Sequence, residues 1–162
     1  MFNILGPLTN PAQPNFYLLG AFSSSMAKLM AEALSGMNID RAFIVHGLNG
    51  WDEPTPVGEF ELYDVKPNRV QHTVRDPKDF GIDRCTEDDL KGGDPKTNSA
   101  ALINVFNQND QGPHKDALVL GTGLALEVSS TVNNLKEGIE LARSTIDDGK
   151  ATQMINSLSI DD

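Results

Sequence analysis

The chain of 162 residues lacks the features that stabilise small secreted proteins or anchor membrane proteins. Its single cysteine, Cys85, excludes an internal disulfide framework. Its longest apolar segment, residues 117–128, is shorter than the ~18 residues of a membrane span and is interrupted by two glycines and Glu127. The start of the sequence is not basic and apolar, so we expect no secretory leader. These absences predict a cytoplasmic protein without a membrane partner.

Positive charge is also scarce. The chain has 13 Lys and Arg against 23 Asp and Glu, which gives a formal net charge of −10 at pH 7. Affinity for a nucleic-acid backbone comes largely from Lys and Arg that displace counterions. We therefore expect no nucleic-acid partner. A small anionic substrate stays possible, because a few backbone amides or one metal ion can hold a phosphate group.

The side-chain sets of covalent and zinc catalysis are missing as well. His46, His72 and His114 are far apart in the sequence, and no pair has the spacing of metal ligands. No serine lies in a nucleophile elbow, and no motif surrounds Cys85. We interpret His46, which lies between a predicted strand and a loop, as a packed or hydrogen-bonded side chain and not as a general base.

Apolar periodicity predicts one helix and three short strands in the first half of the chain. Residues 23–37 carry apolar side chains at helical spacing, and residues 42–45 are a β-prone run typical of a buried parallel strand. Residues 59–65 and 69–74 alternate in part, with Lys66-Pro67-Asn68 between them. These last two segments predict a hairpin at a sheet edge.

Three helices are predicted for the second half of the chain. Their start and end signals are Thr97 or Asn98 for the first, Pro113 for the second, and Asn133 or Asn134 with Gly149 for the third. One or two further helical turns are expected within residues 150–158.

The order of these elements predicts an α/β fold, with a mixed, largely parallel sheet flanked by helices. We expect a single α/β domain over residues 1–162, in which residues 159–162 form a frayed tail. The chain opens directly in a turn-rich motif at residues 1–11, and its strands are few for a complete sheet of this kind. Both observations predict that the domain is truncated at its N-terminal side.

The first candidate site is the loop at residues 46–56, which follows the predicted buried strand and contains the adjacent acids Asp52 and Glu53. Open α/β sheets bind ligands at the carboxyl ends of their strands. Carboxylate oxygens are the ligands that Mg²⁺ prefers, and one or two of them suffice when water and substrate phosphate fill the other positions. The alternative interpretation is a solvated acidic turn, because motifs of two residues are common by chance.

Two glycine-rich segments are weaker candidates. Gly92-Gly93-Asp94 precedes a predicted helix, so its amides could cradle a phosphate group. Asp94 would repel that phosphate, and a turn with a helix N-cap is the better interpretation. Gly121 and Gly123 lie inside an apolar helical run without a preceding strand, so we attribute them to close helix packing and not to a dinucleotide fingerprint.

Motifs along residues 2–157 form an ordered series. They read FNILGPLTNPA at 2–12, LG at 19–20, MAEAL at 30–34, VHG at 45–47, GWDE at 50–53, DFG at 79–81, LKGGD at 90–94, LKEG at 135–138 and IDDGKA at 146–151. The series resembles the anthranilate phosphoribosyltransferases, which belong to a glycosyltransferase family that also includes pyrimidine nucleoside phosphorylases. The opening motif is long and fairly specific, whereas each later motif alone is weak.

The resemblance implies a fold of the nucleoside phosphorylase and phosphoribosyltransferase type, in which a small helical domain precedes a larger α/β domain. The chain resembles most of the α/β domain and lacks the helical one. The glycine-rich phosphate loop and the arginine that meets the anthranilate carboxylate lie upstream of the position of Met1 in the family. We therefore leave the substrate-binding residues unassigned and expect this chain alone to be inactive. The complete protein is expected to be a homodimer.

The resemblance also implies an activity in tryptophan biosynthesis. Family members transfer 5-phosphoribose from phosphoribosyl pyrophosphate (PRPP) to the amino group of anthranilate and release pyrophosphate. Asp52 and Glu53 match the family's acidic pair for Mg²⁺, which binds the pyrophosphate, and no protein nucleophile is required. The chain departs from the family at Trp51, where an aliphatic residue is more usual, while Pro54 and Pro56 are expected to alter the rigidity of the loop.

Two other functions stay open at this point. One is a non-catalytic relative of the same fold that binds nucleic acid, against which the acid pair and the net charge of −10 argue. The other is an enzyme similar to pyrimidine nucleoside phosphorylase, with phosphate as the acceptor. The salt dependence of DNA binding and a phosphorolysis assay distinguish these from a phosphoribosyltransferase.

Overall fold

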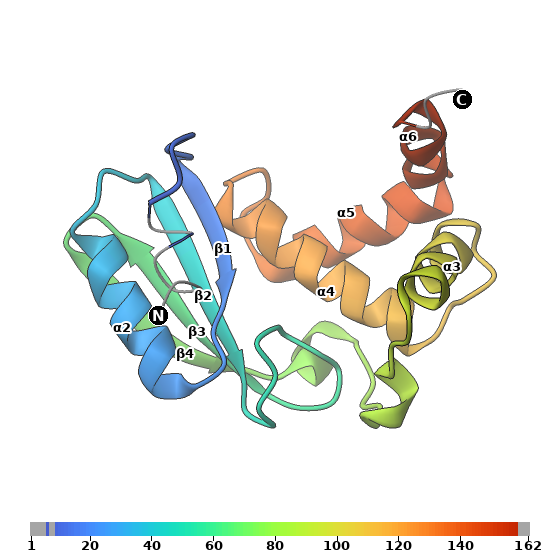
Figure 1. Ribbon diagram of the computed structural model, residues 1–162, viewed down its shortest axis with the longest axis horizontal. Helices are drawn as coiled ribbons and strands as arrows, with labels where there is room; N and C mark the ends of the chain where they lie inside the picture. Colours follow the sequence, from blue (N-terminus) through green and yellow to red (C-terminus); the bar gives the residue numbers. More distant parts are fainter. Residues whose placement is uncertain (1–5, 7–8, 159–162) are drawn as a thin grey trace.

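A computed structural model describes residue 6 and residues 9–158 of the chain. In these residues a four-stranded sheet lies between one helix on one face and a group of helices on the other, as Figure 1 shows. The strands are β1 (Phe16–Gly20), β2 (Arg41–Gly47), β3 (Phe60–Lys66) and β4 (Arg69–Arg75). The α-helices are α2 (Ser24–Ser35), α3 (Pro95–Phe106), α4 (Pro113–Val128), α5 (Leu135–Asp147) and α6 (Lys150–Leu158), with short 3₁₀ helices at η1 (Pro77–Phe80) and η2 (Asp88–Leu90).

The strands follow each other in the sheet in the order β1-β2-β3-β4. Strand β1 runs parallel to β2, with Tyr17 beside Ala42, because α2 carries the chain back between them. Strands β3 and β4 form the predicted antiparallel hairpin, and β3 also runs antiparallel to β2. The mixed α/β class is confirmed, but the parallel share is one strand pair of three, because a loop and a hairpin follow β2 in place of further helical crossovers.

Each face of the sheet has its own apolar core. On the α2 face, Ala42, Ile44 and Val65 pack with the buried side of α2, in which Ala27, Ala31 and Leu34 have no exposed surface. On the other face, residues of the alternate set pack against α4 and α5. They are Phe43, Val45, Phe60 and Leu62. The alternation along β2 and β3 thus places helices on both sides of the sheet.

Helices α4 and α5 cross at two glycines. A Cβ atom on Gly138 would lie 2.6 Å from the carbonyl oxygen of Gly123, and one on Gly123 would lie 3.0 Å from the Leu135 side chain. These distances leave no room for a side chain at the crossing, so the prediction that Gly123 serves helix packing is confirmed. The neighbouring Gly121 has open space around it, so the same prediction is wrong for Gly121.

Two arginines connect the sheet to α4 beside the Phe43 ring. Arg75 donates to both carboxylate oxygens of Glu127, at 2.6 and 3.0 Å, and only 7% of the Glu127 side chain is exposed. Arg41 donates to Asp64 at 2.7 Å and to the Glu127 backbone oxygen at 3.0 Å. Both guanidinium groups lie over the Phe43 ring. The hydrogen bonds to Asp64 raise the pKa of Arg41.

Most element boundaries agree with the predicted ones. The helix predicted at 23–37 spans Ser24–Ser35, the buried strand extends to Arg41–Gly47, and the turns predicted at 150–158 are the helix α6. Strand β1 was not predicted. The expected frayed tail at 159–162 and most of the opening motif, at 1–5 and 7–8, lie outside the described residues.

Within that described part, no helix combines the length and the hydrophobicity needed to cross a lipid bilayer.

Candidate active site

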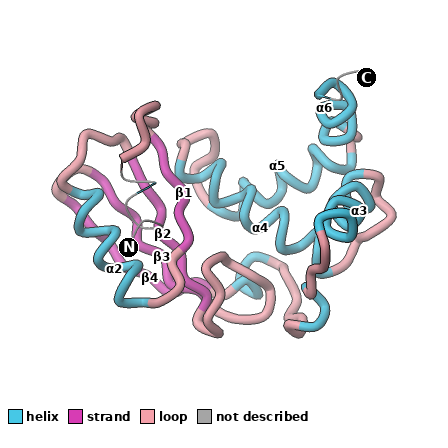
Figure 2. Tube along the Cα trace, in the orientation of Figure 1, coloured by secondary structure: helices cyan, strands magenta, loops and turns pink. Residues whose placement is uncertain are grey.

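The loop between β2 and β3, residues 48–59, is closed by backbone hydrogen bonds. Gly47 N–H donates to the carbonyl oxygen of Trp51 at 2.8 Å, and Gly50 N–H donates to that of Gly47 at 2.9 Å. Gly50 adopts a φ of +91°, which glycine tolerates and most residues do not. At the base of the loop, Leu48 N–H donates to the carbonyl oxygen of Glu59 at 3.0 Å. The loop is therefore an ordered turn and not a loose connection. Figure 2 shows it among the loops at one end of the sheet.

The prolines of the loop lie inside the protein. Pro54, Thr55 and Pro56 are all buried, and Thr55 is only 4% exposed. The carbonyl oxygen of Pro56 accepts a hydrogen bond from the backbone N–H of Cys85 at 3.4 Å. Since proline also fixes its own φ angle, this buried segment makes the loop rigid directly after the acid pair.

The two acids stand at the surface of this rigid loop. Asp52 and Glu53 are exposed, and within residues 9–158 their carboxylates form no ion pair or hydrogen bond with another side chain. Partial burial and the negative charge of Asp52 raise the pKa of Glu53. The pair therefore offers oxygen ligands that repel each other, and a divalent cation would relieve this repulsion. This donor set fits a hard cation such as Mg²⁺.

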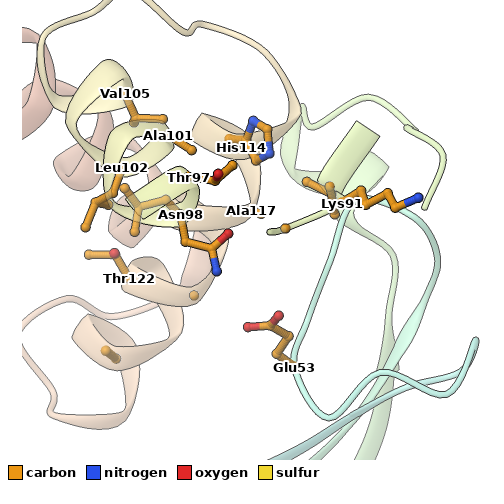
Figure 3. A pocket seen from close by; sticks show the side chains of 15 residues that line it. Glu53, Lys91, Thr97, Asn98, Ala101, Leu102, Val105, His114, Ala117 and Thr122 are labelled. Carbon is orange, nitrogen blue, oxygen red and sulfur yellow. The ribbon is translucent and has the colours of Figure 1, made fainter. Parts of the chain in front are cut away.

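A cleft of about 810 Å³ opens beside Glu53. Its opposite wall consists of α3 and α4, and the segment from Leu90 to Gly92 closes one side. In Figure 3 the Glu53 carboxylate and the Asn98 amide point toward each other across the opening, whereas the Lys91 ammonium group points away from it. The rest of the helix wall is mostly apolar, with Ala101, Leu102 and other small or aliphatic residues.

The Gly92-Gly93-Asp94 segment is a turn with a helix cap, as predicted. The Asn98 side chain accepts from Gly93 N–H at 2.7 Å and donates to the Gly93 carbonyl oxygen at 3.1 Å. The Gly93 amide is thus already used and is not free for a phosphate group. The cap of α3 is Asp94, which accepts from Thr97 N–H at 2.7 Å, so the prediction of Thr97 or Asn98 as the cap is wrong. Pro95 occupies the first helical turn, where its missing N–H costs nothing.

The charged groups at the start of α4 are already paired, and of these only His114 lines the cleft. His114 contacts Asp110 at 2.9 Å, and the hydrogen bond from Gly112 N–H, together with His114, lowers the pKa of Asp110. The buried Lys115 ammonium group donates to Asp147 at 2.6 Å and to Gln111 at 2.7 Å. These groups hold α4 to its neighbours and are not available to a ligand.

The other singled-out residues have structural roles. His46 is buried, and its ring Nδ1–H donates to the carbonyl oxygen of Ala21 at 2.8 Å, which confirms the interpretation as a hydrogen-bonded side chain. Burial raises the pKa of the Cys85 thiol, so this thiol is not activated. Among residues 6 and 9–158, no three His, Cys, Asp or Glu side chains gather as a metal site. The acid pair supplies only two carboxylates, so a Mg²⁺ site of this kind is compatible with that finding.

Sequence reasoning found the acid pair but missed the cleft and the close contact between Gly20 and the Asp52 carbonyl group. The cleft joins Glu53 to residues between Leu90 and Ala125, and no local motif marks it. The signal for the contact was the position of Gly20 at the end of a short apolar run, but one glycine in a sequence does not say which backbone approaches it.

Comparisons with known proteins agree with this architecture. Residues 1–152 match the family described as "Glycosyl transferase family, a/b domain". The chain is 39% identical over 158 residues to the anthranilate phosphoribosyltransferase of Desulforamulus reducens and 40% identical over 158 residues to that of Parvibaculum lavamentivorans. In both cases the alignment covers 98% of this chain and 46% of the relative. The chain thus spans about half the length of these curated relatives.

Solved structures give the same result. The anthranilate phosphoribosyltransferase of Thermus thermophilus superposes with a TM-score of 0.85 at 35% identity, over 96% of this chain and 46% of that one. The Saccharomyces cerevisiae enzyme, in complex with PRPP and Mg, superposes with a TM-score of 0.84 at 29% identity, over 94% of this chain and 44% of that one.

Proposed function

The chain belongs to the glycosyl transferase family with an a/b domain, and from this premise we propose that it serves the transfer of 5-phosphoribose from PRPP to the amino nitrogen of anthranilate, with release of pyrophosphate. The names of the relatives in several bacteria and of the solved neighbours support this reaction. The series of motifs from residue 2 to residue 157 supports it as well. The corresponding place in metabolism is tryptophan biosynthesis.

One observation carries the proposal: two adjacent carboxylates without side-chain partners in the described part of the chain stand on a rigid loop at the carboxyl ends of β1 and β2. Most acids on α4 and α5 are, by contrast, paired or hydrogen-bonded. Neither side chain contributes an ion pair or hydrogen bond to the described fold, and we infer that Asp52 and Glu53 serve a ligand. We propose that this ligand is Mg²⁺, bound to the diphosphate group of PRPP. The complex of the Saccharomyces cerevisiae enzyme with PRPP and Mg supports this choice.

The proposed reaction does not require a covalent bond between the protein and a substrate. The bond from the ribose C1 atom to the pyrophosphate oxygen breaks, a bond from the anthranilate nitrogen to C1 forms, and the amine loses a proton. Mg²⁺ bound at Asp52 and Glu53 would neutralise the charge that develops on the leaving pyrophosphate. The chain itself contributes orientation: the buried Pro54–Pro56 segment and the hydrogen bonds of Gly47 hold both carboxylates in place before the substrate arrives.

The test is cation binding by the full 162-residue chain. Mn²⁺, a spectroscopic substitute for Mg²⁺, is titrated with and without inorganic pyrophosphate and followed by electron paramagnetic resonance. We expect D52N and E53Q each to weaken Mn²⁺ binding at least about tenfold, since even a residue that only supports a metal ligand costs roughly that much. Pyrophosphate should tighten binding in the unmodified chain.

The matched control is E59Q, which removes an exposed acid at the other end of the same loop. Like Asp52 and Glu53, Glu59 forms no side-chain ion pair within residues 9–158, so E59Q tests whether the position or only the charge of an acid matters. E59Q should bind Mn²⁺ as the unmodified chain does. If the D52N/E53Q double variant binds Mn²⁺ with unchanged affinity, the proposed metal role is wrong.

A further inference from the structure

The backbone of the acid pair rests directly on Gly20, the last residue of β1. A Cβ atom built on Gly20 would lie 1.7 Å from the carbonyl oxygen of Asp52 and 2.9 Å from its carbonyl carbon. This is the shortest of the Cβ distances among the described glycines. Gly20 does not have a φ angle in the left-handed region. Glycine is therefore needed at this position for space and not for its backbone freedom.

Hydrogen bonds from β2 hold the backbone that follows Gly20 in place. The next residue, Ala21, donates its N–H to the carbonyl oxygen of Val45 at 2.9 Å and accepts from the His46 ring at 2.8 Å. Ala21 is almost completely buried, and so is His46. Both backbone groups of Ala21 are thus bound by neighbouring residues of β2, the strand that leads into the acid-bearing loop.

We propose that Gly20 is a positioning residue for the acid pair, and that His46 holds Gly20 in place through Ala21. The loop after β2 turns back across the end of β1, and only a residue without a side chain there lets the Asp52 backbone come so close. Gly20 sets the height of both carboxylates above the sheet. The part of this inference that concerns metal binding rests on the proposed function. The part that concerns the position of the loop does not.

The short distance between Gly20 and the Asp52 backbone determines how far the loop must move when Gly20 carries a side chain. Real Cβ contacts are essentially never closer than 3.0 Å, so a methyl group on Gly20 must separate the two segments by at least 1.3 Å, the difference between 3.0 and 1.7 Å. The neighbouring atoms are backbone, which cannot rotate away as a side chain does. Since Pro54–Pro56 is buried, the displacement falls on the short segment that carries Asp52 and Glu53.

The experiment compares G20A with G36A in the full 162-residue chain. Gly36 ends α2, and its added Cβ atom would have an ordinary contact of 3.7 Å, so G36A controls for the loss of a glycine. Two quantities are measured: the affinity for Mn²⁺ in the presence of pyrophosphate, and the amide chemical shifts of residues 47–53 by nuclear magnetic resonance. We expect G20A to weaken Mn²⁺ binding about 10-fold to 100-fold and to shift these amides, with G36A unchanged in both.

A second pair of variants keeps the inference testable if G20A does not fold. H46L removes the hydrogen bond to Ala21, whereas H46N keeps a donor close to the position of Nδ1. We expect H46L to shift the amides of residues 47–53 and to weaken Mn²⁺ binding, and H46N to restore both. A role in packing alone would leave H46N at least as defective as H46L, and that result would overturn the role of His46.

The outcomes separate this inference from the proposed function. If the unmodified chain does not bind Mn²⁺, the metal role fails, and the amide shifts alone then decide on the positioning role. If G20A leaves the amides of residues 47–53 and the Mn²⁺ affinity of a binding-competent chain unchanged, Gly20 does not position the acid pair.

Discussion

The two walls of the cleft use charge in opposite ways. On the helix wall and behind it, acids and bases pair with each other: His114, which lines the cleft, with Asp110, and, away from the cleft, the buried Lys115 with Asp147 and Arg143 with Asp116. On the loop wall, Asp52 and Glu53 lie side by side without a side-chain partner among the described residues, and their mutual repulsion helps to raise the pKa of Glu53. The loop wall carries an electrostatic cost that the helix wall avoids.

This contrast teaches which charges serve the fold and which serve a ligand. A paired charge lowers the free energy of the folded state or at least avoids the cost of an unpaired one. An unpaired like-charge couple does neither, so it has to be held in place by something else. Here the backbone does this: a glycine at the end of β1, buried prolines, and hydrogen bonds that close the loop. Substitutions on the helix side should therefore affect stability, and substitutions of the acid pair should affect binding.

The largest expected effect on stability is that of E127A, which leaves the Arg75 guanidinium group unpaired between α4 and the sheet. Because the Glu127 side chain is only 7% exposed, we expect a loss of about 3–5 kcal/mol in the free energy of unfolding. Urea unfolding followed by circular dichroism measures it. E127Q keeps one acceptor and should lose less. A loss below that of an ordinary surface substitution would mean that the ion pair does not join the two layers.

The next effect concerns the crossing of α4 and α5. G138A adds a methyl group 2.6 Å from the Gly123 carbonyl oxygen, and overpacking of this kind costs about 1–3 kcal/mol. G121A is the matched control on α4, because its methyl group meets open space and alanine favours the helix. In thermal unfolding, G138A should have a lower melting temperature than the unmodified chain and G121A a higher one. Equal melting temperatures would show that the helices can move apart without cost.

A smaller effect is expected for D110A, and it should depend on pH. The pKa of Asp110 is lowered from its ordinary value of 3.8, so its stabilisation is present above pH 3.8 and is lost as the pH falls through the lowered value. At pH 7 we expect D110A to lose about 1 kcal/mol, the value of one hydrogen bond. The difference from the unmodified chain, followed by urea unfolding across this pH range, should shrink below pH 3.8. D110N, which still accepts from Gly112 N–H, should lose less at pH 7.

The smallest effect on stability is expected for the acid pair itself. E53Q should change the free energy of unfolding by no more than about 0.5 kcal/mol, as is usual for surface positions. The change should be a gain at neutral pH, because the pKa of Glu53 is raised and the charged form carries the cost. This gain should vanish as the pH falls below the ordinary value of 4.5, where the carboxyl group is protonated in both states. A large destabilisation at pH 7, measured by the same urea titration, would contradict the contrast between the two walls.

Much of the fold could be predicted from local signals in the sequence. Pro113 starts α4, Asn134 caps α5, and Gly149 follows the end of α5 with a φ of +72°. The hairpin of β3 and β4 agrees with its alternating pattern, and Asn68 at its turn has a φ of +58°. These features depend on a few neighbouring residues, which is why the sequence alone was sufficient.

Other features depend on distant parts of the chain. Strand β1 has only five residues, too few for a clear period, and it is defined by its pairing with β2. Helix α3 carries apolar side chains at helical spacing, but only Val105 on this helix is buried, while Ala101 and Leu102 line the cleft. Periodicity finds an apolar face and does not say whether protein or a cleft lies opposite. The sequence suggested a cap in the Gly92-Gly93-Asp94 turn as well as Thr97 or Asn98, and Pro95, which follows Asp94, is the local signal that favours the first of these.

The single tryptophan of the chain lies one residue before Asp52, and its backbone oxygen closes the turn with Gly47. Since the other aromatic residues are two tyrosines and seven phenylalanines, light at the red edge of protein absorption excites the Trp51 indole almost alone. Its emission is a built-in optical signal from the acid-bearing loop, and stopped-flow mixing can follow how fast a cation or diphosphate reaches this loop without any label.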